Sequence, residues 1–170
     1  MLPRHIEAAT TGPDGRLQPN PEYLLFDDLV LRDVLAREHR TLFDVIRAAT
    51  GDAHVHDMRD LLADVLADVQ VRSDVLSQVA QHEALIGGAL TEANRGWLTD
   101  ASPRQCAWSL LTGARPDGTT LLQWPMPNLL FARDCLAVVG HVVMQMRPRH
   151  PARWRDGVVA RAVAQHSPLF

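Results

Sequence analysis

The sequence predicts an α/β fold in which a helical block interrupts segments that are typical of strands. Apolar runs rich in Leu and Val lie toward both ends of the chain, at residues 22–31 and 129–146, and they suit buried strands. Between these runs, apolar residues recur at intervals of three and four, which indicates amphipathic helices. We therefore divide the chain into an N-terminal arm with a first α/β module (1–57), an inserted helical subdomain (58–122) and a second α/β segment (123–170).

The first unit begins with a segment that has no apolar periodicity. Residues 1–21 carry four prolines and two glycines, so we expect an irregular arm there. The run 22–31 predicts a buried strand, and residues 32–49 carry the apolar stripe of an amphipathic helix. A second short strand is predicted at 53–58.

The middle unit is predicted to be helical throughout. The N-caps are expected at Asp57 or Asp60 for the first helix, at Ser73 for the second and at Ser102 for the last. Their side-chain oxygens can accept from the first free backbone N–H groups of each helix. Pro103 after Ser102 is favourable at the first helical position. The first expected helix starts after Asp57 or Asp60 and ends near residue 68. Three more are expected at approximately residues 73–86, 90–98 and 103–113.

The last unit begins with a connection rich in turn formers, at residues 114–128. Residues 129–134 and 136–146 are then predicted as buried strands, since they are apolar and partly β-branched. Pro151 is placed to open a final helix. The apolar side of that helix is expected to carry Trp154, Val158, Val159, Ala162 and Val163.

Composition excludes several classes of function. With 170 residues and a net charge of −3, the chain shows no broad basic stripe, so we expect no nucleic-acid partner. It contains no run of about 18 apolar residues and no signal-peptide pattern, so we expect no membrane association and a cytoplasmic location. His54 and His56 lack a third ligand at a suitable spacing, and we expect no metal and no cofactor.

The most unusual stretch is PMPNLLFARD, residues 125–134. Two prolines restrict its backbone, and the apolar run ends in the charged pair Arg133–Asp134. An internal salt bridge, from Arg133 to Asp134 or to an acidic side chain upstream, would account for that pair structurally. A binding site is the alternative interpretation.

This stretch is similar to the proline-Asn-x-x-Phe-Thr-Arg-Asp signature of arginine deiminases. MRPRHPARWRD, at residues 146–156, resembles the Met and Pro-Ala-Arg-Arg-x-Glu stretch that follows in that family, and YLLFDD, at 23–28, resembles its early strand. The resemblance begins at about residue 20. It implies a partial pentein fold, an α/β propeller of ββαβ modules with an inserted helical bundle, and therefore a single incomplete catalytic domain.

The resemblance also implies roles for particular residues. Asp134 would be a catalytic carboxylate that grips the substrate guanidinium, and Phe131 would pack on the alkyl stem of the substrate. Asn128 and Arg153 would hold the α-carboxylate, while Leu25 would line the pocket. A carboxylate suits a planar guanidinium, and an Arg fork suits a free carboxylate, because both pairs form two parallel hydrogen bonds.

In that family, a Cys thiolate and a His hydrolyse L-arginine to L-citrulline and ammonia, and both motifs follow the segment that this sequence contains. Cys106 and Cys135 are expected to be buried structural thiols. The chain is then a substrate-binding part that a second polypeptide or a continuation completes, an inactive arginine-binding or regulatory half-barrel, or a truncated remnant. The ligand is expected to be L-arginine or a related guanidine, and an oligomer is compatible with the sequence.

Overall fold

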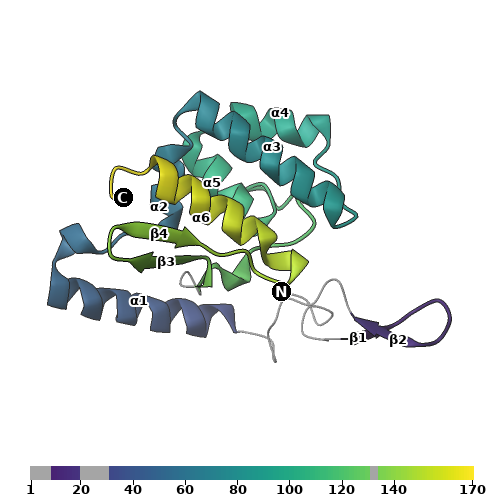
Figure 1. The fold of residues 1–170 in the computed structure, drawn as a ribbon, viewed down its shortest axis with the longest axis horizontal. Coiled ribbons are helices and arrows are strands. Elements are labelled where there is room, and N and C mark those ends of the chain that lie inside the picture. Colours follow the sequence, from purple (N-terminus) through teal and green to yellow (C-terminus); the bar gives the residue numbers. More distant parts are fainter. Residues whose placement is uncertain (1–8, 20–30, 131–133) are drawn as a thin grey trace.

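The computed structural model describes residues 9–19, 31–130 and 134–170 (Figure 1). These residues form six α-helices and two small antiparallel sheets of two strands each. The mixed character of the fold is therefore confirmed, although the described part is mostly helical. It shows no propeller, so the expected propeller modules are not seen among these residues. No helix in the described part is long and apolar enough to cross a membrane.

The elements follow one another in a simple order. The strands are β1 (Ala9–Thr11), β2 (Leu17–Pro19), β3 (Leu136–Val139) and β4 (Val142–Gln145). The helices are α1 (Arg32–Thr50), α2 (Met58–Val65), α3 (Val69–Leu85), α4 (Glu92–Asp100), α5 (Pro103–Thr112) and α6 (Trp154–His166). Short 3-10 turns lie at Asp52–His54, Pro127–Leu130 and Pro151–Arg153.

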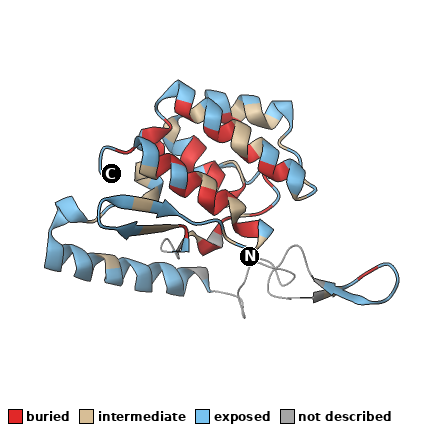
Figure 2. Ribbon diagram, viewed as in Figure 1, coloured by how far each residue is buried: buried red, intermediate tan, exposed pale blue. Residues whose placement is uncertain are grey.

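The core lies between the helices of the predicted helical block and the last helix of the chain. Helix α6 packs on α2 and α3, and α5 packs on α2 (Figure 1). Figure 2 shows the buried residues gathered in this group of helices. The fully buried apolar side chains include Leu62, Leu66, Leu76, Val79, Leu98, Leu110, Val159 and Val163. The same core therefore holds the helical block and the C-terminal helix together.

Side-chain caps explain where these helices begin. The Asp57 carboxylate accepts from the backbone N–H of Arg59 at 2.8 Å, and Ser102 forms the predicted cap of α5, with Gln105 closing a capping box. The prediction that Ser73 caps the next helix is wrong. Asp68 caps α3 by accepting from two backbone N–H groups, and because this cap lies earlier in the chain, Ser73 falls inside the helix.

The N-terminal unit differs from the sequence prediction in two places. A hairpin, β1–β2, lies within the arm that we expected to be irregular. Residues 53–58 form no strand, because the chain turns at Asp52–His54 and the following residues have no partner strand in the described part. The amphipathic helix at 32–49 is confirmed as α1, whereas the expected strand at 22–31 lies outside the described residues except for Leu31.

The C-terminal strands also differ from expectation. The run predicted as one buried strand at 136–146 is a hairpin, β3–β4, that turns at Gly140, whose φ of +60° suits glycine. Its valines are largely exposed, with Val138 at 64%. Within the segment 129–134, Leu129 and Leu130 belong to the 3-10 turn Pro127–Leu130, so the expected strand is absent from the described part of that segment.

Helix α1 exposes an apolar side. Its hydrophobic residues Leu35, Leu42, Val45 and Ile46 are all exposed, and Figure 2 shows the helix as a largely exposed rod. A stripe of this kind normally packs against another element. The valines Val138, Val139 and Val142 of β3–β4 are exposed as well, so both elements present apolar side chains to solvent.

Candidate functional site

Three of the five predicted site residues come together in the structure. Asp134 lies two residues before β3, Asn128 lies in the 3-10 turn at Pro127–Leu130, and Arg153 ends the 3-10 turn before α6. The Arg153 guanidinium joins them, since its Nη1 donates to Asp134 Oδ2 at 2.6 Å and its Nη2 donates to the Asn128 carbonyl at 3.3 Å. Phe131 and Leu25, the other two, lie outside the described residues.

A second carboxylate holds Arg153 from the other side. Arg153 Nε donates to Asp156 Oδ2 at 3.0 Å, and Asp156 is buried in the first turn of α6. Burial raises the pKa of Asp156, while the charges of Arg153 and Arg155 partly oppose that rise. The sequence analysis missed this residue, although its place three positions after Arg153 on a helix turn was an available signal.

The charge of Arg153 is stabilised strongly at this position. Burial by itself disfavours the charged guanidinium, but the hydrogen bonds and negative charges of Asp134 and Asp156 outweigh it, and the pKa of Arg153 is raised. All three of its nitrogens take part in hydrogen bonds. The result is a charged cluster in which one arginine is shared by two aspartates.

The cluster opens to solvent on the Asp134 side. The Asp134 side chain is 50% exposed, whereas that of Arg153 is 9% exposed. Both line a cavity of about 670 Å³, together with Arg149, His150 and apolar side chains of the same loop. A cavity of this size lies within the range typical of small-molecule sites. Asp134 therefore presents a carboxylate at the wall of an accessible cavity.

The internal salt bridge of Asp134 differs from the one that the sequence suggested. The structural alternative paired Arg133 with Asp134 or with an acidic side chain upstream, but Arg133 lies outside the described residues. The partner found for Asp134 is Arg153, 19 residues further along the chain. Asp134 thus already binds a guanidinium group in this structure.

A buried ion pair fixes the segment that carries Arg153. The Arg155 guanidinium donates to Glu83 Oε1 at 3.2 Å and to the Trp124 carbonyl, while Glu83 Oε2 accepts from the backbone of Gln123 at 2.8 Å. Glu83 belongs to α3 and Arg155 to α6, and both side chains are almost completely buried. The helical block is therefore bonded directly to the start of α6.

Neither cysteine of the sequence has the properties of a nucleophile here. Cys135 and Cys106 are both fully buried, as expected, and burial raises the pKa of each thiol to about 11. A thiol with such a pKa carries almost no thiolate at neutral pH. His54 and His56 are exposed, and the described residues hold no group of three potential metal ligands.

His82 makes the stability of this region sensitive to pH. Its Nε2 lies 3.0 Å from the Pro151 carbonyl, which can only accept, so Nε2 carries the proton. Burial is the main cause of the lowered pKa of His82. Because the unfolded chain takes up this proton near pH 6.5 and the folded protein resists it, the free energy of unfolding falls as the pH drops below about 6.5.

We expect His82→Gln to reduce this dependence on pH. Glutamine keeps a donor for the Pro151 carbonyl but cannot take up a proton. Urea unfolding at about pH 7.5 and about pH 5.5 should give a smaller loss of unfolding free energy for the variant than for the wild type. The control His166→Gln removes an exposed histidine and should keep the wild-type loss. An equal loss in all three proteins would contradict the assignment to His82.

Comparison with known proteins gives a consistent result. A family model described as arginine deiminase matches residues 22–170. An arginine deiminase of Limosilactobacillus fermentum is 25% identical over 165 residues, and one of Staphylococcus aureus strain JH9 is 29% identical over 169 residues. Each alignment covers 88% of this chain and 40% of the relative. The chain thus spans about 40% of the length of these relatives.

Proposed function

Because the chain belongs to the arginine deiminase family, we propose that it is the substrate-binding part of an enzyme that hydrolyses L-arginine to L-citrulline and ammonia. The observation that supports this proposal is the bond between Asp134 and the Arg153 guanidinium at 2.6 Å. Asp134 accepts a guanidinium N–H in a position where half of its surface faces a cavity. The same carboxylate is therefore suited to the guanidinium of a ligand, L-arginine or a related guanidine.

The other site residues complete this proposal by resemblance. Asn128 and Arg153 would lie at the end of the pocket that receives the α-carboxylate, and Arg153 is bonded both to Asp134 and to the backbone carbonyl of Asn128. Phe131 would pack on the alkyl stem, and Leu25 would line the pocket. The buried Glu83–Arg155 pair supports the arrangement, since it anchors the chain two residues after Arg153.

We further propose that another part of the deiminase fold, as a continuation of the chain or as a second polypeptide, supplies the nucleophilic Cys and the His. The two cysteines of this sequence are buried, and burial raises the pKa of each thiol to about 11, which does not suit a nucleophile. The exposed apolar sides of α1 and of β3–β4 offer a surface for that part. Two unpaired thiols suit the reducing cytoplasm, where we place the reaction.

An arginine-binding protein without catalysis is the second candidate. The burial of both cysteines favours it over independent catalysis by these residues. The two candidates differ in one respect, because the enzyme component gains activity with a partner and the binding protein does not. Both require Asp134 to bind the guanidinium.

We expect the purified 170-residue chain to form no citrulline from L-arginine by itself. Addition of a polypeptide that carries the missing Cys and His motifs should restore citrulline formation, which a colorimetric assay measures. Cys106→Ser and Cys135→Ser, which remove the two buried thiols, should not change the rate of the folded, completed enzyme. Citrulline formed by the isolated chain would contradict the argument from the cysteines, and activity absent with every such polypeptide would favour the binding protein.

A further inference from the structure

A second cavity lies where α6 faces α3 and β4, and it has a volume of about 310 Å³. Its polar and aromatic lining comes from three elements and from the loop after β4: Gln78, Gln81, His82, Gln145, Trp154 and Arg161 from the elements. The loop contributes Arg147. Among the described residues, this cavity shares only Met146 with the cavity at Asp134. The two cavities are therefore separate sites.

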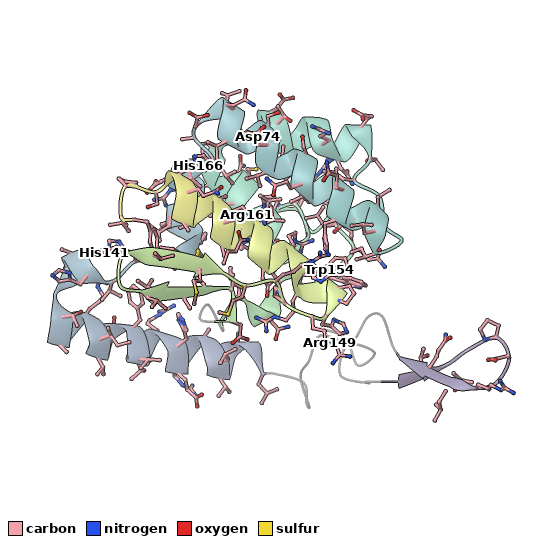
Figure 3. All side chains as sticks on the ribbon, in the orientation of Figure 1. Asp74, His141, Arg149, Trp154, Arg161 and His166 are labelled. Carbon is pink, nitrogen blue, oxygen red and sulfur yellow. The ribbon has the colours of Figure 1, made fainter. Side chains whose placement is uncertain are left out.

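Two arginines of this second cavity are held in place by their neighbours. The Arg147 guanidinium lies over the Trp154 ring, 4.1 Å from the ring centroid. Arg161 Nε donates to Gln145 Oε1 at 2.7 Å, and Gln145 Nε2 in turn donates to the Gly157 carbonyl at 3.0 Å. Figure 3 shows Trp154 near the start of α6 and Arg161 further along the same helix. Both guanidiniums therefore have defined positions at the wall of one cavity.

The positive charge of these two arginines is not compensated within the part of the chain that the structure describes. The described lining of the cavity contains no carboxylate. Neither Arg147 nor Arg161 forms a salt bridge with an acidic residue of the described ranges. The charge of Arg147 also reaches His82, where it adds to the effect of burial in lowering the pKa. The cavity is consequently a region of positive potential, which favours anions.

The lining also holds polar groups that lack partners among the described residues. His82 is 5% exposed, and its Nδ1 has no hydrogen-bond partner there. The Glu83 carboxylate lies 3.8 Å from this atom, which is too far for a hydrogen bond, and it bonds Arg155 instead. Because His82 Nε2 donates to the Pro151 carbonyl, Nδ1 is an acceptor. A buried polar atom without a partner is unusual in a folded protein and indicates that a donor is missing from the site.

We propose that this cavity binds a phosphate group, as inorganic phosphate or as a small phosphate monoester. Two guanidiniums suit the two negative charges of phosphate, because each can donate parallel hydrogen bonds to its oxygens. A hydroxyl of the ligand, which hydrogen phosphate and the monoesters of polyols both carry, can donate to His82 Nδ1. The volume of about 310 Å³ lies at the lower end of the range for small-molecule sites, as a small anion requires. This site does not depend on the proposed function.

The test follows the indole N–H resonance of Trp154 while inorganic phosphate is added to the isotope-labelled 170-residue chain at constant ionic strength. Trp154→Phe identifies that resonance among those of the four tryptophans. We expect a saturable shift in the wild type, and an increase of about tenfold in the dissociation constant for Arg147→Met and for Arg161→Met, as for the loss of one charged hydrogen-bonding partner. Methionine keeps an unbranched stem and removes the charge. The control Arg37→Met removes an exposed arginine of α1 that does not line the cavity, and it should bind phosphate as the wild type does.

Further titrations identify the source of the phosphate group and exclude a general attraction for anions. Tighter binding of glycerol 3-phosphate than of inorganic phosphate would assign the site to a monoester, and the reverse would assign it to the free ion; either result supports the proposal. Malonate, a dicarboxylate, should bind more weakly than both. A shift that does not saturate, an unchanged dissociation constant in both Arg147→Met and Arg161→Met, or equally tight binding of malonate would overturn the phosphate site. Circular dichroism of each variant verifies that it is folded, as expected for substitutions at exposed positions.

Discussion

Replacement of Glu83 by alanine is expected to lower the free energy of unfolding by about 3–5 kcal/mol, which is typical when one partner of a buried ion pair is removed. Glu83 is 1% exposed and bonds both Arg155 and the backbone of Gln123. Its removal leaves the Arg155 charge buried without a carboxylate partner on α3. Burial already lowers the pKa of Arg155, which shows that this position is unfavourable for an unpaired charge.

Urea unfolding monitored by circular dichroism measures this effect. Glu83→Gln removes the charge but keeps one acceptor oxygen, which can bond either Arg155 or the Gln123 backbone N–H, so its loss should be smaller than that of the alanine variant. Glu38→Ala, at an exposed position of α1, should change the free energy of unfolding by less than about 0.5 kcal/mol. A loss below about 1 kcal/mol for Glu83→Ala would show that the pair does not hold the helical block to α6.

Asp134→Ala is expected to weaken arginine binding by about 10- to 100-fold, the effect of losing charged hydrogen bonds to a guanidinium. In the completed enzyme, the same change should abolish citrulline formation. Stability should fall by about 1 kcal/mol or less, because Asp134 is half exposed and Asp156 still pairs with Arg153 after the change. A large effect on binding combined with a small effect on stability is therefore the expected signature.

Calorimetric titration with L-arginine and urea unfolding of the same preparations give both quantities. Asp44→Ala provides a matched control, since it removes an exposed carboxylate from α1 at a distance from the cavity lining. Arg153→Ala should cause a larger loss of stability than Asp134→Ala, because Arg153 is nearly buried and joins two aspartates. Unchanged arginine affinity in Asp134→Ala would exclude Asp134 from the binding site.

Local signals predicted the helices better than the strands. The cap at Ser102 and the end of α5 at Gly113 follow from residues that are adjacent in the sequence, and the structure has both. A strand depends on a partner that can be distant in the chain. Residues 53–58 and the described part of 129–134 have suitable side chains but no partner strand in the described part, and they form turns or extended chain instead.

The candidate site shows the same division between local and distant information. Asn128, Asp134 and Arg153 were found because their spacing resembles a family signature, and the structure brings them together. Asp156 and the Glu83–Arg155 pair were missed, since burial makes these charges important and burial is not visible in composition. Glu83 and Arg155 are 72 residues apart, and only the packing of α3 on α6 makes them partners.

The bond between Arg153 and Asp134 has a consequence for any measurement of affinity. Arg153 carries the same chemical group as the proposed ligand and is tethered to the same chain, so it acts as an intramolecular competitor at a high effective concentration. Dilution of the protein does not lower the effective concentration of the Arg153 guanidinium at Asp134, whereas it lowers the concentration of a free guanidine. The free energy that a ligand gains at Asp134 is only the difference between that of its own bonds to Asp134 and that of the Arg153 bond that it displaces. Under the proposed function, the affinity for a guanidine would therefore include the cost of breaking the bond between Arg153 and Asp134.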